Sequence, residues 1–300
     1  MWCKTCNIET NEPICPICGN KTVEDVPTEV YWCHTCRVPI INKATQSDKG
    51  ICPICHGKAQ YLVADLRPVF PEERLLLELL LGKEPNAFAN ASVWASNSSY
   101  YVDGKRKSLP IKLFAEADTN YLVAQLEKYK DNNLTEGFEQ FSRLFCVANE
   151  NHLHSIVTEA TAFVRDAASR FKEENLVISF SGGKDSTVTA DLTTSALGTT
   201  GLVHIFGDTT LEFPMTRRYV ERYRKDHPHA IFMVARNAEQ NFLNVCEDIG
   251  PPARMMRWCC SMFKTGPITR TLNSLYRNQQ ILTFYGIRKA ESVSRSKYNR

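Results

Sequence analysis

The spacing of hydrophobic residues in the second half of the chain predicts a buried strand followed by a helix. Residues 176–180 are a short, mainly apolar and β-branched run, as in strands buried within a parallel sheet. Val188, Leu192 and Ala196 then recur at intervals of four residues, which predicts a helix over 187–197. The residues between these two elements must therefore turn from a strand into a helix.

Further apolar runs predict that this strand belongs to a larger sheet. They lie at 203–206, 230–234 and 281–285 and are separated by helical segments. Before the first strand we expect an amphipathic helix over 152–175 that covers the sheet with an apolar face of Ile156, Ala160, Phe163, Ala167 and Phe171. Alternating strands and helices favour an α/β fold with a doubly wound parallel sheet, in which ligands bind at the carboxyl ends of the strands.

The turn after residue 180 is rich in glycine and serine and carries one lysine. Its sequence is Ser181-Gly182-Gly183-Lys184-Asp185-Ser186. Adjacent glycines let the backbone turn tightly and approach a ligand, and the first N–H groups of the helix have no partner within it. Lys184 adds positive charge. We therefore expect a phosphate-binding loop, although its spacing is neither that of the Walker loop nor that of the dinucleotide-binding glycine motif.

The first 55 residues contain four C-x-x-C pairs, arranged as an internal repeat of pair, spacer and pair. This spacing lets two thiolates on one tight turn reach a single tetrahedral metal ion. We expect two Cys₄ zinc sites, with a rubredoxin-type iron or disulfides as the alternatives, and a glycine that allows the turn after the second sulfur of Cys15/Cys18 and of Cys52/Cys55. The ligands of the two sites would be Cys3, Cys6, Cys15 and Cys18, and Cys33, Cys36, Cys52 and Cys55.

Residues between the cysteine pairs and the parallel sheet predict a small α+β block. Pro71 and Gly82 bracket a leucine-rich helix. Alternation over 92–102 predicts a strand, and Asp103-Gly104 predicts a hairpin that returns at 109–114. We thus divide the chain into ribbons at 1–64, an α+β domain at 65–150 and a nucleotide-binding domain at 151–300.

Composition narrows the class of protein further. The chain has 300 residues and a net charge of +3, which is too small to indicate nucleic-acid binding by itself. From Arg254 onward, however, there are ten basic residues against one acidic residue, Glu291, as suits a polyanionic ligand or a solvated basic surface. No apolar run reaches the ~18 residues of a membrane span and no secretory signal is visible, so we expect a cytoplasmic protein.

Four segments in order resemble the phosphoadenylyl-sulfate (PAPS) reductase family and the wider group of PP-loop ATP pyrophosphatases. The loop at 181–186 is similar to the S-G-G-x-D-S motif, and 208–214 to D-T-x-x-E-F-P. Trp258-Cys259-Cys260 with Lys264 and Pro267 resembles W-C-C-x-x-x-K-x-x-P, and 286–295 resembles G-x-R-x-x-E-S-x-x-R. The ribbons and the α+β block are similar to microbial members with N-terminal zinc ribbons and a PUA-like module, which serves as an RNA-binding module or as a spacer.

The resemblance implies an adenine nucleotide, ATP or PAPS/APS (phosphoadenylyl- or adenylyl-sulfate), held by the loop. It implies that Asp208 contacts adenosine and that Lys184, Arg288 and Arg295 act on phosphate or sulfate oxygens, to which guanidinium groups bind bidentately. Asp185 would repel phosphate unless a cation intervened, which favours a bound Mg²⁺, whereas a helix-capping role is the alternative.

Cys259 and Cys260 leave two alternatives open. In the iron–sulfur members of the family, such a pair supplies two ligands of a [4Fe–4S] cluster, and a later C-x-x-C supplies the others. No such pair occurs before Arg300, so the remaining ligands lie beyond the sequence or the cluster is absent.

Three functions fit these motifs. The first is an ATP pyrophosphatase that adenylylates a substrate and helps to transfer sulfur to tRNA or DNA from a sulfur donor. The second is a sulfonucleotide reductase that uses thioredoxin or another thiol and releases sulfite. The third is a nonenzymatic nucleotide-binding subunit of a regulatory or defence complex. The ribbons and the basic C-terminal region favour the first.

Overall fold

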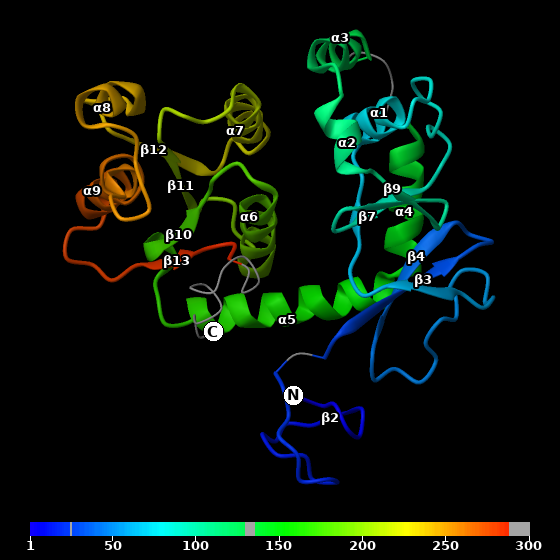
Figure 1. The fold of residues 1–300 in the computed structure, drawn as a ribbon. Coiled ribbons are helices and arrows are strands. Elements are labelled where there is room, and N and C mark those ends of the chain that lie inside the picture. Colours follow the sequence, from blue (N-terminus) through cyan, green and yellow to red (C-terminus); the bar gives the residue numbers. More distant parts are fainter. Residues whose placement is uncertain (25, 130–135, 288–300) are drawn as a thin grey trace. The chain divides into compact units, whose positions relative to one another are not determined.

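The computed structural model describes residues 1–24, 26–129 and 136–287, which fold into two compact units (Figure 1). Contacts divide the chain into unit 1, residues 1–155, and unit 2, residues 156–300. Within the described residues, no helix is both long and apolar enough to cross a bilayer.

Unit 2 is built on a four-stranded parallel sheet. Its strands are β10 (Leu176–Ser179), β11 (Val203–Asp208), β12 (Ile231–Arg236) and β13 (Leu282–Phe284). The spatial order is β12-β11-β10-β13, and every neighbouring pair is parallel. The order reverses between β10 and β13, so the loop that follows β10 lies at the position where such sheets bind ligands. The predicted α/β fold is confirmed.

Helices cover both faces of this sheet. On one face, the end of α5 (Glu150–Ala168), α6 (Lys184–Leu197) and α7 (Pro214–Asp226) pack over a core that includes Ile178, Phe180 and Phe206. On the other face, α9 (Gly266–Leu275) packs on Val177 and Ile205. The remaining helical segments of the unit are η1 (Glu173–Asn175), α8 (Phe242–Ile249) and the π-helix η2 (Cys260–Thr265).

The helices bury faces that agree only in part with the prediction. In α6, Ala196 is buried as predicted, but Val188 is 56% exposed, and Ser186, Ala190 and Thr193 pack against the sheet in its place. In α5, which ends at Ala168 and not at 175, Phe163 is 54% exposed whereas Val164 is buried. Small residues let a helix approach a sheet closely, and hydrophobicity counts alone do not register this.

Unit 1 contains three antiparallel sheets and several helices. The ribbon sheets are β1 (Trp2–Cys3) with β2 (Ile8–Glu9), and β4 (Val38–Lys43), β3 (Thr28–Cys33) and β5 (Gln60–Val63) in that order. The third sheet runs β6 (Arg67–Pro68), β7 (Val93–Ser96), β8 (Ser99–Val102) and β9 (Lys105–Ser108). The helices are α1 (Pro71–Leu80), α2 (Ile111–Ala115), α3 (Thr119–Tyr129) and α4 (Glu136–Ala148).

The hairpin predicted at Asp103-Gly104 forms, but its neighbours differ from the prediction. The segment 92–102 is two strands joined at Asn97, which adopts φ 49°, and not one strand. The strand that returns is the fully exposed, basic β9, whereas most of 109–114 enters α2. A charged edge strand of this kind discourages pairing with another chain, and alternation of hydrophobic residues does not reveal it.

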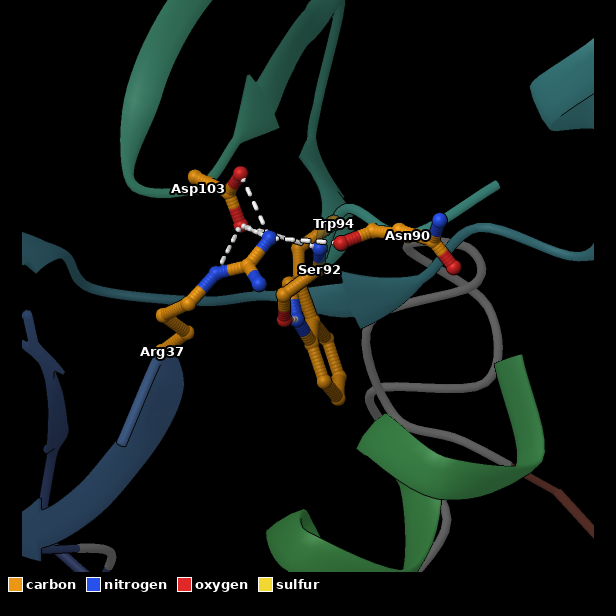
Figure 2. Close-up of polar contacts among 5 residues, drawn as sticks. All are labelled: Arg37, Asn90, Ser92, Trp94 and Asp103. Carbon is orange, nitrogen blue, oxygen red and sulfur yellow. Dashed lines mark hydrogen bonds and ion pairs between the residues drawn. The ribbon is translucent and has the colours of Figure 1, made fainter. Parts of the chain in front are cut away.

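The second ribbon is packed into the rest of unit 1 and does not stand apart from it. Asn149, just after α4, accepts a hydrogen bond from the Ile41 N–H at 2.6 Å and donates one to the Pro39 carbonyl at 3.0 Å. Figure 2 shows a second link, in which the Arg37 guanidinium lies against Asp103 and the carbonyl of Asn90. Arg37 Nη2 lies 2.7 Å from Asp103 Oδ1, which also accepts a hydrogen bond from the Ser92 N–H.

The Arg37–Asp103 link predicts a measurable contribution to the stability of unit 1. Arg37→Ala removes a bidentate ion pair in which the Arg37 side chain is 41% exposed and the Asp103 side chain 36% exposed. It also removes the contact of the Arg37 guanidinium with the Phe141 ring. We expect a loss of about 1–2 kcal/mol in the free energy of unfolding, measured in urea by tryptophan fluorescence.

Arg143→Ala provides the matched control. Arg143 forms a helical ion pair with Glu139 in which both side chains are more exposed, at 79% and 56%. We expect it to cost only about 0.3–0.5 kcal/mol. Equal losses in the two variants would contradict a structural role for the Arg37 link.

Candidate functional site

The eight N-terminal cysteines gather into the two predicted groups of four. In each group the four sulfur atoms lie within 4.8 Å of one another: Cys3, Cys6, Cys15 and Cys18, and Cys33, Cys36, Cys52 and Cys55. The Sγ atoms of Cys3 and Cys18 are 3.5 Å apart, and those of Cys36 and Cys52 are 3.8 Å apart. A tetrahedral zinc ion with Zn–S bonds of about 2.3 Å separates its sulfurs by about 3.8 Å, so both groups fit zinc.

The backbone turns in the same way at all four cysteine pairs. The residue after the second cysteine of each pair has a positive φ: 50° at Asn7, 71° at Gly19, 54° at Arg37 and 56° at His56. The glycine predicted at this position is confirmed at Gly19. In the second ribbon the positive φ is at His56 and not at Gly57, so the prediction of a glycine at this turn is wrong there. The cysteine pair fixes the position of the turn at the residue directly after Cys55, whichever residue that is.

Hydrogen bonding favours the thiolate form at one sulfur of each group. The backbone N–H of Cys18 lowers the pKa of Cys15 from 9.0 to about 7, and that of Gly57 lowers the pKa of Cys55 to about 7. A group with a lowered pKa stays ionised until the pH falls through that value. Burial and sulfur–sulfur hydrogen bonds raise the pKa of other thiols in the groups, such as Cys6 and Cys36. Because zinc binds thiolates, we expect affinity for zinc to fall progressively as the pH decreases.

Ser186 braces the glycine-rich loop between β10 and α6. Its Oγ accepts a hydrogen bond from the Ser181 N–H at 3.2 Å and donates one to the Gly183 carbonyl at 2.9 Å. Gly183 is the N-cap residue of α6, and no side chain of the described residues caps it. Asp185 therefore lies in the first turn and is not the cap. The first N–H groups of α6 remain available to bind an anion.

Two glycines allow close packing around this loop. Gly182 has φ +72°, and a Cβ there would lie 2.7 Å from Cγ2 of Val220 in α7. A Cβ on Gly286 would lie 2.7 Å from the Asp185 carbonyl oxygen and from Thr189 Oγ1. The fold thus brings the start of the predicted 286–295 motif against the first turn of α6. Arg288, Glu291 and Arg295 themselves lie outside the described residues.

Charged side chains lie near the loop and at the ends of the neighbouring strands. Lys184 is 71% exposed, and its Nζ lies 3.2 Å from Asp185 Oδ1. Asp208, at the end of β11, is 14% exposed and accepts a hydrogen bond from the Thr210 N–H at 2.9 Å. Arg217 and Arg236 lie 3.5 and 3.7 Å from its carboxylate. The sequence motifs did not include these two arginines. Only their positions could have indicated them: Arg217 lies in the helix that follows β11, and Arg236 is the last residue of β12.

Cys259 and Cys260 lie beyond the end of β12, at the start of η2. Both are partly buried, and the Arg257 guanidinium lies 3.4 Å from the Cys260 sulfur. Trp258 packs against Phe242 with ring centroids 5.1 Å apart. In the described part of the chain, neither cysteine belongs to a group of three or more side chains able to hold a metal. These residues alone therefore do not complete a cluster site.

A cavity of about 470 Å³ adjoins this segment. It lies at the end of β12 and is lined by Arg236, Asn237, Ala238, Glu239, Ser261, Met262 and Arg270. Arg236 connects the cavity to Asp208, so the two sites adjoin at the carboxyl edge of the sheet. Such an edge holds ligands in doubly wound folds.

Comparisons with known proteins agree with this architecture. Residues 175–300 match the family model of the phosphoadenosine phosphosulfate reductase domain. One uncharacterized protein of Methanocaldococcus jannaschii is 33% identical over 176 residues, 59% of this chain, and a second is 30% identical over 151 residues, 50% of this chain. Each match spans 35% of the relative's own length.

A solved structure is also similar in part. The phosphate complex of PAPS reductase from Candida auris is 19% identical, with a TM-score of 0.31, over 44% of this chain and 64% of that one. The family match spans the segment, residues 175–300, in which the four motifs lie. Two Cys₄ groups able to hold a metal precede it.

The cysteine geometry predicts about two zinc ions per chain, one in each group. Cys33→Ser should lose one zinc and also destabilise α4, because Cys33 and Cys52 share a buried cluster with Ala148. Nucleotide binding, which belongs to unit 2, should be retained. Elemental analysis, hydrogen exchange of α4 and ATP titration measure the three effects.

Cys3→Ser is the matched control in the first ribbon. It should also lose one zinc, but exchange in α4 should stay unchanged, since Cys3 belongs to no described cluster with that helix. Protein without zinc, or disulfides at these positions, would contradict the assignment.

The loop geometry makes Gly182 the residue most sensitive to substitution. Gly182→Ala adds a Cβ at a positive φ and against Val220, so the loop must shift. We expect affinity for ATP to fall about tenfold or more, which corresponds to ~1.4 kcal/mol, by isothermal titration calorimetry.

Gly198→Ala separates this effect from backbone strain alone. Gly198 ends the same helix with φ +67°, and a Cβ there would meet no atom within 4 Å. It should lower stability and leave ATP affinity unchanged. If both variants bind ATP as the wild type does, the loop is not the phosphate site.

Proposed function

We propose that the chain acts as a PP-loop ATP pyrophosphatase that adenylylates a nucleic-acid acceptor during sulfur transfer. The observation that carries the proposal is the first turn of α6, where the N-cap residue Gly183 offers no side-chain cap among the described residues. This turn is reached through the positive-φ turn at Gly182, beside the switch point between β10 and β13. Backbone N–H groups at a helix start bind phosphate. The zinc-type ribbons and the basic C-terminal segment support a polyanionic acceptor.

The proposed reaction has two balanced steps. An acceptor oxygen attacks the α-phosphorus of ATP and forms a new P–O bond. The bond between the α-phosphorus and the oxygen that bridges to the β-phosphate breaks, and pyrophosphate leaves. A sulfur nucleophile from the donor then displaces AMP, with the C–O bond broken and a C–S bond formed. The first step makes a poor leaving group into a good one.

The loop residues would take distinct parts in this reaction. The N–H groups of the first turn of α6 and the Lys184 ammonium would bind the pyrophosphate oxygens, and Asp208 would orient the adenosine. A Mg²⁺ ion, which reduces repulsion between phosphates and carboxylates, would be held by Asp185 together with the nucleotide. The exposed first turn of α6 offers such a ligand, since Asp185 lies in it.

Arg288 and Arg295 would stabilise charge that develops on the phosphates. The close packing of Gly286 on the Asp185 carbonyl supports this proposal, because Gly286 begins the motif to which both arginines belong. Removing either arginine should then depress turnover more than ATP affinity.

A sulfonucleotide reductase is the second candidate, and the family match supports it. Such an enzyme would bind PAPS or APS in the same loop and release sulfite with electrons from a thiol or thioredoxin. Cys259 and Cys260 would then belong to a [4Fe–4S] cluster whose other ligands lie outside the described residues.

Two reaction mixtures distinguish the candidates. In the first, the full chain meets ATP labelled at the α-phosphate, with Mg²⁺ and either tRNA or DNA; we expect pyrophosphate and transfer of the label to the acceptor, and release of labelled AMP once sulfide is added as the sulfur nucleophile. In the second it meets PAPS or APS with thioredoxin; we expect no sulfite. Sulfite in the second mixture without pyrophosphate in the first would make the sulfonucleotide reductase the better assignment. If neither product forms, a nonenzymatic nucleotide-binding role is favoured.

A further inference from the structure

Helix α7 carries an excess of positive charge on its exposed side. It contains five basic residues and two acidic ones, Glu221 and Asp226, within 13 residues. Its inward side is apolar or aromatic, with Val220 and Tyr223 buried in the core of unit 2. The basic residues are Arg217, Arg218, Arg222, Arg224 and Lys225, and all are exposed.

Most of this charge is not neutralised within the protein. Arg217 pairs with Asp208. The Arg222 guanidinium carbon lies over the Tyr219 ring, 5.3 Å from the ring centroid. In the described part of the chain, no carboxylate lies within ion-pair distance of Arg218, Arg224 or Lys225. Glu221 is spaced to pair with Arg218 or Lys225 on the helix, but none of the ion pairs of the described residues includes it.

Three of these residues form one stripe along the helix. Arg218, Arg222 and Lys225 are spaced at i, i+4 and i+7, so they share a face. The stripe is about 10 Å long at 1.5 Å per residue. A stripe of that length can contact about two or three neighbouring phosphates of one nucleic-acid strand.

The stripe lies on a helix that packs against the phosphate loop. Val220 of α7 lies against Gly182, and the Tyr219 hydroxyl is 3.0 Å from that of Thr187 in the first turn of α6. Both helices cover the same face of the sheet (Figure 1). The stripe lies on the exposed side of this helix, opposite Val220, so a polyanion bound along it would lie across α7 from the loop.

Helix electrostatics explain only part of the charge. Arg224 and Lys225 lie in the last turn, where cations offset the helix dipole. Arg218 is the fifth residue of the helix and lies beyond the first turn, so the dipole does not account for a cation there. A ligand that compensates this charge accounts for its position.

We infer that the Arg218–Arg222–Lys225 stripe of α7 binds the phosphodiester backbone of the nucleic-acid acceptor and holds it on the outer face of the helix that packs against the loop. The inference rests on the proposed function, since it names the surface that would receive the acceptor. Such contacts bind phosphates irrespective of base sequence, so they position the acceptor and do not select its bases.

The test replaces all three side chains by glutamine, as Arg218→Gln, Arg222→Gln and Lys225→Gln together. Binding of a fluorescent DNA duplex and of a folded RNA with the same number of phosphates is measured by anisotropy over a range of salt concentrations. We expect affinity to fall about tenfold or more, and the slope of log affinity against log salt for the duplex to decrease by about 2–3. The two probes distinguish DNA from RNA as the source of the phosphates.

A second triple variant controls for a general loss of positive charge. Lys105, Arg106 and Lys107 form the exposed strand β9 of unit 1, and their replacement by glutamine removes the same charge. Unchanged binding in the α7 variant, or an equal loss in the β9 variant, would overturn the inference. The latter result would move the nucleic-acid surface to unit 1.

ATP titration separates this inference from the proposed function. The α7 variant should bind ATP as tightly as the wild type, because the described hydrogen bonds and ion pairs of residues 181–187 involve none of these three side chains. If the wild type binds ATP but neither nucleic acid, the inference fails while the nucleotide site stands. If it binds nucleic acid but not ATP, the proposed function fails instead.

Discussion

The close approach of three backbone segments at Gly182, Gly286 and the start of α6 is the constraint on which unit 2 depends. At Gly182 the loop packs so closely on α7 that a Cβ would clash with Val220. At Gly286 the segment after β13 packs equally closely on the Asp185 carbonyl. Ser186 holds the intervening turn by hydrogen bonds at both ends. With the loop fixed in this way, the N–H groups of α6 are oriented before an anion arrives, which reduces the cost of binding.

Unit 1 depends on a different kind of constraint, because two Cys₄ groups able to hold a metal and several polar links take the place of part of an apolar core. The second Cys₄ group lies in the same buried cluster as Ala148, and Asn149 and Arg37 join its strands to the α+β block. The first group has fewer links, among them a hydrogen bond from Asn7 to the Ala44 carbonyl at 2.9 Å. Two repeats of similar sequence thus have different surroundings.

The sequence predicted those features that arise from local spacing. The parallel strands, the glycine-rich turn and both Cys₄ groups follow from periodicity or from short motifs, and the structure confirms them. Features set by long-range packing were not predictable. Val188 is exposed because Ala190 and Thr193 fit the sheet better, and the Arg37–Asp103 pair joins residues far apart in the chain. The arginines around Asp208 belong to no motif, so only the fold brings them together.

Hydrogen exchange of the backbone amides with and without MgATP tests the account most directly, because the account assigns phosphate binding to backbone N–H groups. It predicts slower exchange at residues 181–187 when MgATP is added. It also predicts slower exchange around residue 286, together with unchanged exchange throughout residues 1–155. Unchanged exchange at 181–187, or protection confined to unit 1, would contradict it.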